Sequence, residues 1–519
     1  MTCHRSRVLT PAVVALLSGA RALSFVRACE AALPVAAALY AAVFLACVAA
    51  RLTFGFELSW MESGMQAMVD RLAAGQSMYA EPSSAYVPFM YPPMYYVAAD
   101  AVSRGLPALH GPVAMRLVSA LSTVATAVAL LLCLRRPDPR LSPRLRLVLA
   151  GLVFAFYGRF QFWQDTSRVD SLFVLLLFGA LALLIEGRGA RSAAIAGLLA
   201  ALATLTKQPA IPLVGACAVV VAVVTGDRRR VLLTGAVWSA TLVALTAALG
   251  ELRNPWFYYY LLELPAAHRW LASHFGWGLI FVATTMPSFA FSSWRLLRRA
   301  SPVAIDSGRV ASDETRAAAD RAWAATFAAS TAILLMLQMK DGANINFFLP
   351  LVPTGIMVAA AAVRRFGSRA SPLLFAQLAV LIYNPLAAIP TSSDWQAGFE
   401  LREAVRGVAG DVFVPQLAGI LAGSGKAPVA HRAAVCDLAD VRPEFISALD
   451  AEIRAGRYAA AVFYADYGDF PLSCQLPSLA RDFQPQQAAP TGGRLFAAGP
   501  HARHGRIYRF DQVGHAGAP

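Results

Sequence analysis

The segment Ser171-Leu-Phe-Val-Leu-Leu-Leu-Phe-Gly-Ala-Leu-Ala-Leu-Leu-Ile185 is apolar, and Arg188 and Arg191 follow it closely. Apolar runs of this kind recur along the chain, and a helix that crosses a bilayer needs about 20 mostly apolar residues. The unbroken Ala, Leu and Val content of these runs excludes the alternating pattern of a membrane β-barrel. The segment therefore predicts a helical protein that crosses a membrane many times.

The composition agrees with this class. Of 519 residues, 57% are hydrophobic and 15% are charged, and the mean hydropathy is +0.53. Soluble domains average about 25% charged residues. The net charge is +14, but most Arg residues lie in short clusters between apolar runs, as cytoplasmic anchors do. We therefore expect membrane lipid as a partner and no binding to nucleic acid.

About eleven helical spans are predicted. Their ranges are 34–52, 113–134, 147–157 with an aromatic extension to 163, 171–185, three that end at 206, before 228 and near 249, and then 279–297, 323–337, 347–363 and 373–389. An apolar stretch at 8–26, broken by Arg21, resembles a signal peptide, but we expect it to form an interfacial or cytoplasmic helix.

The charge distribution predicts the orientation of these spans. With a cytoplasmic N-terminus, every Arg cluster falls on the cytoplasmic face. The loops that share the opposite face are 54–92, 158–170, 206–209, 250–277 and 338–346. The predicted organisation is a cytoplasmic or interfacial segment 1–33, a transmembrane domain 34–390 and an extracytoplasmic C-terminal domain 391–519. The fold class is an all-α polytopic membrane protein with a small soluble α/β domain.

The tail differs in pattern from the rest of the chain. Residues 399–408 and 442–454 predict helices, and residues 412–414, 459–464 and 506–510 predict strands. Cys436 and Cys474 both lie in this tail and can form a disulfide if it is extracytoplasmic. The other cysteines lie in or beside apolar segments without metal-ligand spacing, and no pair of His has such spacing, so we expect no metal site.

The outer loops carry the candidate chemistry, because ionisable groups near a membrane face are functional candidates. Glu62 has two interpretations. Ser59-x-x-Glu62 fits a capping box that starts a helix reaching Ala74. Alternatively, Glu62 shares one helical face with Gln66 and Asp70, and its carboxylate is a candidate general base.

Other polar residues of these loops are open to the same two interpretations. Ser167-x-x-Asp170 also fits a helix cap, and Arg168 beside Asp170 fits a weak surface pair. Lys207 ends a predicted span, where a cation suits the helix dipole. The loop that contains Lys340, Asn344 and Asn346 has the Gly and Asn content of an ordinary turn.

Three sequence pieces together resemble the GT-C superfamily of membrane glycosyltransferases, in the branch of family 39 and of the bacterial transferases related to the aminoarabinose transferase and the protein mannosyltransferases. The pieces are Glu62 soon after the first span with Arg71-Leu-x-x-Gly75-Gln-x-x-Tyr79 and Tyr91-Pro-Pro-x-Tyr95-Tyr96; Arg168-x-Asp170-Ser171 with Thr206-Lys207-Gln208; and Lys340-x-Gly342-x-Asn344-x-Asn346-Phe-Phe-Leu-Pro350. The resemblance covers about residues 34–390.

The resemblance implies transfer of a sugar from a polyprenyl-phosphate donor to an envelope lipid, glycan or protein on the outer face. It implies Glu62 as the base, with Asp170 in reserve. The residues that it implies for substrate binding are Arg168, Lys207, Gln208, Arg269, Lys340, Asn344, Asn346, Tyr79, Tyr91 and Tyr95. Members of the superfamily often carry Asp-Glu in the first loop, whereas here Met61 precedes Glu62, so no metal or other cofactor is expected.

Two other functions compete with this hypothesis. A secondary transporter would show broken spans in paired halves and charges near the middle of the membrane, whereas here the polar groups gather on one face. An assembly protein would use its tail to bind envelope partners and would not need Glu62. The Ala-rich and Arg-rich residue usage is typical of bacterial high-GC coding, so the expected location is a bacterial inner membrane.

Overall fold

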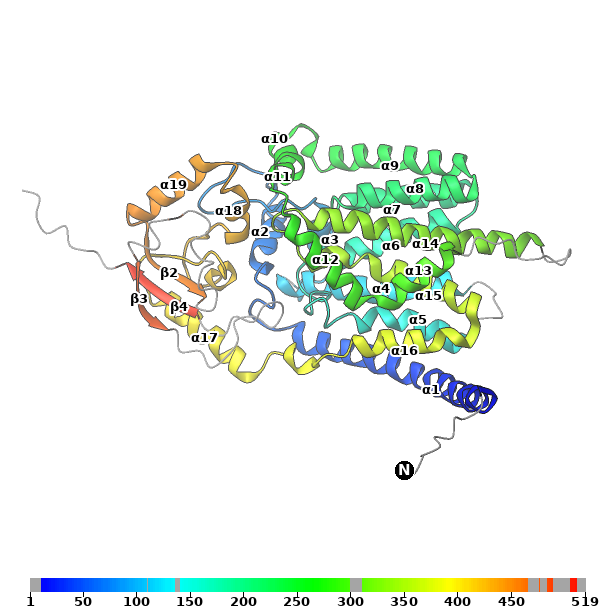
Figure 1. Cartoon of the computed structure of the whole chain (residues 1–519). Coiled ribbons are helices and arrows are strands. Elements are labelled where there is room, and N and C mark those ends of the chain that lie inside the picture. Colours follow the sequence, from blue (N-terminus) through cyan, green and yellow to red (C-terminus); the bar gives the residue numbers. More distant parts are fainter. Residues whose placement is uncertain are drawn as a thin grey trace, which may run out of the picture.

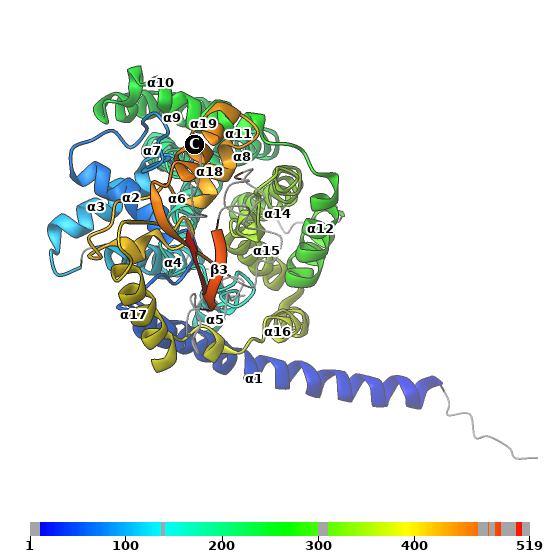
Figure 2. The same cartoon turned by 90° about the vertical axis from the view of Figure 1, so that its left-hand side faces the viewer.

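A bundle of long helices and a smaller α/β tail make up the structure (Figure 1). The computed structural model describes residues 11–109, 111–135, 141–298, 310–464, 476, 483–488 and 505–510. The tail lies over one end of the bundle, and Figure 2 looks onto that end.

The predicted spans coincide with helices of the bundle. These are α1 (Pro11–Arg51), α4 (Pro112–Leu134), α5 (Pro143–Ala155), α6 (Asp170–Glu186), α7 (Gly189–Thr204), α8 (Ala210–Thr225), α9 (Arg228–Ala248), α12 (Ala272–Thr285), α13 (Pro287–Arg298), α14 (Val310–Gln338), α15 (Leu351–Phe366) and α16 (Ser371–Val380). Helix α1 continues through Pro34, so the predicted N-terminal segment and the first span share one helix.

Length and composition set how many helices qualify as spans. Among the described residues, four stretches are long and apolar enough to cross a membrane, within α1, α4, α9 and 345–387. Helices α12 and α13 add a fifth candidate, bent by 89° where Pro287 begins the second helix. Helices α7 and α8 are apolar but shorter. The predicted number of eleven spans therefore stays a prediction.

Local sequence explains several helix ends. Ser142 accepts a hydrogen bond from the Leu145 N–H and precedes Pro143, which suits the first turn because it lacks an N–H. Asp227 caps α9 in the same way, by accepting from the Arg230 N–H at 3.0 Å. Gly226 lies between α8 and α9 with φ of 72°, a conformation that costs glycine little. The Ala- and Leu-rich helices thus reverse direction in only a few residues.

The predicted outer loops lie together at the tail end of the bundle (Figure 1). The first of them is folded: α2 (Glu62–Ala73) lies within it and α3 (Met94–Gly105) follows it. The stretch 250–271 holds η1 (Glu251–Arg253), α10 (Pro255–Tyr258), η2 (Tyr259–Glu263) and α11 (Leu264–Ala267), and η3 (Ile345–Phe348) precedes α15. The sequence pattern predicted α2 but not the short helices at 251–267.

The tail contains a mixed sheet. Its elements are α17 (Ser392–Arg406), β1 (Asp411–Phe413), η6 (Ala418–Leu421), α18 (Arg432–Leu438), α19 (Pro443–Arg454), β2 (Tyr458–Tyr464), β3 (Phe483–Ala488) and β4 (Gly505–Phe510). The strand order is β1-β2-β4-β3; β1 is parallel to β2, and the other pairs are antiparallel. The predicted helices and strands of the tail are confirmed within a few residues, except that α17 begins earlier, and η6, α18 and β3 were not predicted. Cys436 is disulfide-bonded, and Cys474 lies outside the described residues.

One hydrophobic core joins the first outer loop to the tail. It contains Met65 and Tyr96 from the loop side and Leu401 and Val435 from the tail. The contact is close at Gly64, where an added Cβ would lie 2.8 Å from Cγ of His431 in the tail.

His431 adds a polar contact at the same boundary. Burial lowers the pKa of His431 to about 4, so the ring is neutral at pH 7. Its Nδ1 accepts from the Ala433 N–H, and the protonated Nε2 therefore donates to the Trp60 carbonyl at 2.6 Å. The tail is thus fixed to the loop by packing and by a directed hydrogen bond.

We expect Gly64→Ala to destabilise the protein. Alanine favours a helix by about 1 kcal/mol relative to glycine, but its Cβ would lie 2.8 Å from His431 Cγ and would overlap Phe89. Overpacking of this kind costs about 1–3 kcal/mol, so the midpoint of thermal unfolding should fall. Gly215→Ala in α8 is the control, because its Cβ meets nothing within 4 Å. An unchanged midpoint for Gly64→Ala would show that the tail does not pack closely on α2.

Candidate functional site

Glu62 and Arg116 form a fully buried ion pair at the tail end of the bundle. The Arg116 Nη2 lies 2.6 Å from Glu62 Oε2, and its Nε donates to Oε1 at 3.1 Å. The backbone N–H groups of Leu58 and Ser167 donate to the same carboxylate at 2.7 and 2.8 Å. Four donors therefore hold one carboxylate, and through it the first outer loop is joined to the loop before α6.

The predicted capping box at Ser59 is wrong. Helix α2 begins at Glu62 itself, and within the described part of the chain no side chain caps it and the buried Ser59 hydroxyl has no hydrogen-bond partner. The predicted cap Ser167-x-x-Asp170 is wrong for the same reason, since no side chain caps α6. In the first case, the Glu62 carboxylate accepts from the Leu58 N–H and pairs with the buried Arg116.

Arg116 also determines the ionisation of Glu62. Burial raises the pKa of Glu62, but the Arg116 guanidinium and the N–H donors outweigh burial, so the net pKa lies below its usual value. A carboxylate with a lowered pKa and four donors is a weak proton acceptor. This geometry favours a positioning role for Glu62, and its role as the base stays a prediction.

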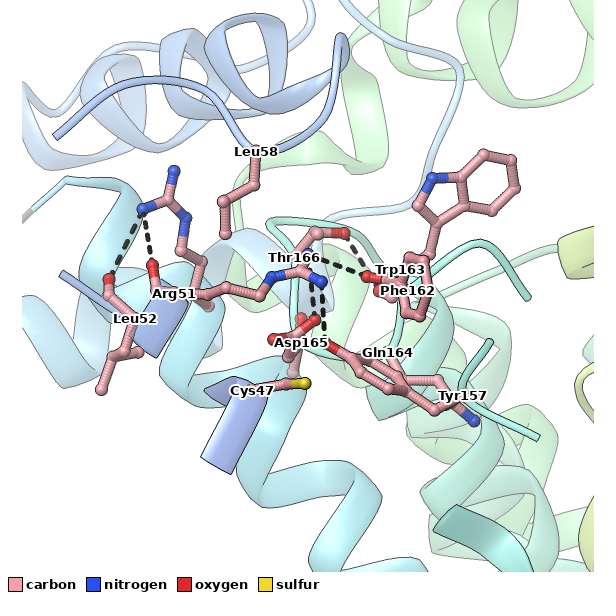
Figure 3. A network of polar contacts seen from close by, with 12 residues as sticks. Cys47, Arg51, Leu52, Leu58, Tyr157, Phe162, Trp163, Gln164, Asp165 and Thr166 are labelled. Carbon is pink, nitrogen blue, oxygen red and sulfur yellow. Dashed lines mark hydrogen bonds and ion pairs between the residues drawn. The ribbon is translucent and has the colours of Figure 1, made fainter. Parts of the chain in front are cut away.

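A second buried arginine supports the neighbouring loop. Figure 3 shows the Arg51 guanidinium pointing toward Asp165, at 3.3 Å, and donating to the Tyr157 hydroxyl and the Phe162 carbonyl. Gln161 and Phe162 both have positive φ, 54° and 59°, which is strained for residues other than glycine. The hydrogen bond from Arg51 to the Phe162 carbonyl helps to hold this strained turn.

The loop before α6 and the loop before α8 meet in a cluster of charges. Asp170 Oδ1 lies 2.7 Å from Lys207 Nζ and accepts from Asn346 Nδ2 at 2.9 Å, and Asp170 Oδ2 lies 3.2 Å from Arg168 Nε. All four side chains are buried. Burial lowers the pKa of Lys207, and the Asp170 carboxylate opposes this effect. The structure thus brings together four of the predicted site residues from three separate loops.

This cluster holds two cationic side chains and one carboxylate, and one donor is left over. Arg168 Nη1 is buried and has no hydrogen-bond partner within the part of the chain that the structure describes. The Arg168 guanidinium lies over the ring of Trp163 at 4.2 Å, which fixes its direction. A buried guanidinium N–H without a partner costs free energy, and an anionic ligand would supply the missing acceptor.

The predicted aromatic and amide residues lie in different surroundings. Tyr79 and Tyr95 are buried, and their hydroxyls donate to the carbonyls of Tyr91 and Met115. The Tyr91 ring is partly exposed, with its centroid 6.0 Å from Lys207 Nζ. Of these three tyrosines, Tyr91 is best placed to meet a ligand.

The remaining predicted residues also make local contacts. The Gln208 side chain donates to the Met90 carbonyl at 2.6 Å, and Asn344 caps η3 through the Ile345 N–H. Lys340 Nζ donates to the carbonyls of Ala266 and His268. These groups hold their loops in place.

Arg269 contacts acidic residues that lie outside the Asp170 cluster. It is 71% exposed and lies 3.5 Å from Asp341 and 3.6 Å from Asp440 of the tail. Among the described residues, no group of three His, Cys, Asp or Glu side chains could hold a metal ion.

A cavity of about 180 Å³ lies between the first outer loop and the tail, and Glu57 and Glu62 both line it. Glu57 Oε1 accepts from the Gly419 N–H at 3.2 Å, and Oε2 accepts from the Ser63 N–H at 3.4 Å. Burial raises the pKa of Glu57 to about 8. With no cation paired to it among the described residues, Glu57 is the more basic carboxylate of the two.

Sequence reasoning missed Glu57, Arg51, Arg116 and Asp165. One signal was present for Arg116: it lies within the predicted span 113–134, where a charge needs a buried partner. Arg51 similarly lies in the predicted span 34–52. Neither sequence position indicates which acidic residue is the partner.

Residues 99–252 match the family described as dolichyl-phosphate-mannose-protein mannosyltransferase. The fold is similar to that of ArnT from Cupriavidus metallidurans in the apo state, with a TM-score of 0.58, 14% identity, and 91% of this chain and 97% of that chain covered. For the same protein bound to undecaprenyl phosphate, the TM-score is 0.54, the identity is 14%, and the coverage is 92% and 98%. None of the curated protein sequences matches the chain.

The pair of Glu62 and Arg116 can be tested by a double-mutant cycle. Glu62→Gln or Arg116→Met alone leaves one buried charge unpaired, which costs about 3–5 kcal/mol of stability. The double variant should recover part of that loss, as measured by thermal unfolding in detergent. If Glu62 only positions the loops, folded Glu62→Gln should lose activity but keep the wild-type dependence of kcat/KM on pH. Loss of that pH dependence in folded Glu62→Gln would instead support Glu62 as the base.

Proposed function

Because the chain belongs to the GT-C superfamily of membrane glycosyltransferases, we propose that it moves a sugar from a polyprenyl-phosphate donor to an acceptor hydroxyl at the tail end of the bundle. The acceptor is an envelope lipid, glycan or protein, and the membrane is a bacterial inner membrane with the tail on its outer side. The ArnT structure with undecaprenyl phosphate supports a lipid-linked phosphate as the donor class.

The observation that carries this proposal is the unpartnered Arg168 Nη1 in a cluster with one more cation than carboxylates. When a sugar leaves a polyprenyl phosphate, negative charge grows on the phosphate oxygens. Fixed cations in a site of low water content stabilise that charge strongly. Arg168 would donate through Nη1, and Lys207 would supply positive charge while Asp170, which also accepts from Asn346, holds Lys207 in place.

The transfer needs a base for the acceptor. In the proposed step, the acceptor oxygen gives its proton to a carboxylate and bonds to the anomeric carbon of the sugar. The bond from that carbon to the phosphate oxygen breaks, and polyprenyl phosphate leaves with the electron pair. Glu57 suits the base role because it lines the cavity and has a pKa of about 8, near the working pH. Glu62 and Asp170 follow as candidates if Glu57 is dispensable.

This function makes a prediction for Arg168. In nanodiscs, the wild type should release sugar from at least one donor in a panel of radiolabelled polyprenyl-phosphate sugars. Arg168→Gln should weaken the binding of polyprenyl phosphate about 10- to 100-fold, because it removes a charged hydrogen bond worth about 1.5–3 kcal/mol. The measurement is competition by polyprenyl phosphate against the labelled donor.

Arg159→Gln is the matched control, since Arg159 lies on the same loop but is exposed and donates to the Val380 carbonyl. Equal affinities in wild type, Arg168→Gln and Arg159→Gln would contradict the role of Arg168. No sugar release from any donor would contradict the proposed function.

The base assignment predicts a pH dependence. A base must be deprotonated, so with a pKa of about 8 for Glu57 the value of kcat/KM should rise up to about tenfold per pH unit below 8 and level off above it. Glu57→Gln should lose about 100- to 10,000-fold in rate and also lose this pH dependence. Glu81→Gln, at an exposed carboxylate of the same outer loop, is the control. A Glu57→Gln variant that retains the wild-type rate and profile would move the base role to Glu62.

A further inference from the structure

The cavity beside Glu57 has walls from two distant parts of the chain. Phe56, Glu57 and Gln66 come from the first outer loop, whereas Arg402 and Gly419 come from the tail. Its volume of about 180 Å³ is several times the roughly 30 Å³ that one water occupies in the liquid. It is below the roughly 300–1,000 Å³ of sites for drug-sized ligands. The space therefore suits one small polyol or one sugar-sized group.

Arg402 is the cation of this cavity. It lies on α17, and its guanidinium lies over the Phe56 ring at 4.7 Å. Its Nε is buried without a hydrogen-bond partner, and no carboxylate lies within ion-pair distance of it among the described residues. Asp394 also lines the cavity, but its carboxylate accepts from the Thr391 N–H at the start of α17. The unpaired guanidinium N–H is thus available to an anion.

Two other polar side chains of the cavity, Gln66 and Glu57, offer hydrogen-bond acceptors. Gln66 donates through Nε2 to Asp70, and its Oε1 is buried without a partner among the residues that the structure describes. The two hydrogen bonds to Glu57 are long, at 3.2 and 3.4 Å, so its oxygens are only weakly held. A hydroxyl that donates a hydrogen bond would satisfy Gln66 or Glu57.

We propose that this cavity binds the acceptor as an alcohol that also carries a phosphate or carboxylate, with the hydroxyl at Glu57 and Gln66 and the anionic group at Arg402. The inference rests on the proposed function and adds the chemical class of the acceptor. Mostly apolar walls with a few placed polar groups are typical of small-molecule sites. The same chemistry occurs in a soluble polyol phosphate and in a glycerophospholipid headgroup.

The tail is then part of the acceptor site. The Gly419 N–H holds the Glu57 carboxyl, and an added Cβ at Gly419 would lie 3.1 Å from Glu57 Oε1. Arg402 reaches the cavity only because α17 packs against Phe56, where Gly398 permits the close approach. An acceptor in the cavity would therefore contact the first outer loop and the tail at once.

Binding of a defined probe tests the proposal without turnover. The full-length protein in dodecyl maltoside is titrated with sn-glycerol 3-phosphate and, separately, with glycerol, by calorimetry. We expect saturable binding of the phosphate at least tenfold tighter than that of glycerol. Arg402→Gln should weaken it about 10- to 100-fold. Arg406→Gln is the matched control on the same helix, because Arg406 is exposed and paired with Glu403 at 2.6 Å.

Each outcome has a defined meaning. Displacement of the probe by phosphatidylglycerol in mixed micelles would assign the alcohol to a lipid headgroup, and its absence would assign it to a soluble acceptor. No saturable binding, or equal losses in the two Arg variants, would overturn the proposal. Arg402→Lys, which keeps the charge, replaces Arg402→Gln if that variant does not fold.

Sugar release from the donor panel, measured on the same preparations, separates this inference from the proposed function. Donor turnover without probe binding would overturn the acceptor site and leave the function standing. Arg402-dependent probe binding without turnover of any donor would support the binding site and contradict the proposed glycosyltransferase function.

Discussion

The polar end of this protein depends on the buried pair of Arg116 and Glu62. Arg116 lies near the start of α4 and donates to the carbonyls of Phe54 and Phe56 as well as to Glu62. Glu62 in turn accepts from the Ser167 N–H of the loop before α6. Two ions removed from water are costly, and only excellent geometry with full hydrogen bonding offsets that cost. One side-chain pair thus fixes the backbone of two loops, and both loops carry the proposed chemistry.

The distribution of unpaired charge follows from this arrangement. Glu62 and Asp165 each form an ion pair with a buried arginine, so neither is free to neutralise another cation. Asp170 is shared between Lys207 and Arg168, and among the described residues Nη1 of Arg168 has no acceptor. On the tail side, Nε of Arg402 also has no partner in the part of the chain that the structure describes. The two unpaired donors lie in separate sites, which suits a reaction with two substrates that each carry negative charge.

Much of the fold was predictable because its signals are local. Apolar runs located the helices, Arg clusters assigned the loops to one end, and turn patterns located most of the tail elements. The pairing of charges was not predictable, since Arg116 and Glu62 are 54 residues apart and Arg51 contacts a carbonyl 111 residues away. The convergence of Arg168, Asp170, Lys207 and Asn346 was anticipated only through the superfamily resemblance. The long-range contacts depend on how the helices pack, and a single sequence does not specify that packing.

Two carboxylates of one loop illustrate how packing decides chemistry. Glu57 and Glu62 are five positions apart and line the same cavity. Arg116 and two backbone N–H groups keep Glu62 ionised with a lowered pKa, whereas burial, with no paired cation among the described residues, raises the pKa of Glu57 to about 8. Surroundings that separate the pKa values of two neighbouring carboxyls also separate their roles. A carboxylate stabilised by four donors gains little from a proton, so it serves best as a fixed anchor. A carboxyl without such stabilisation binds a proton readily near neutral pH, and this property is the one that an acceptor hydroxyl requires of its base.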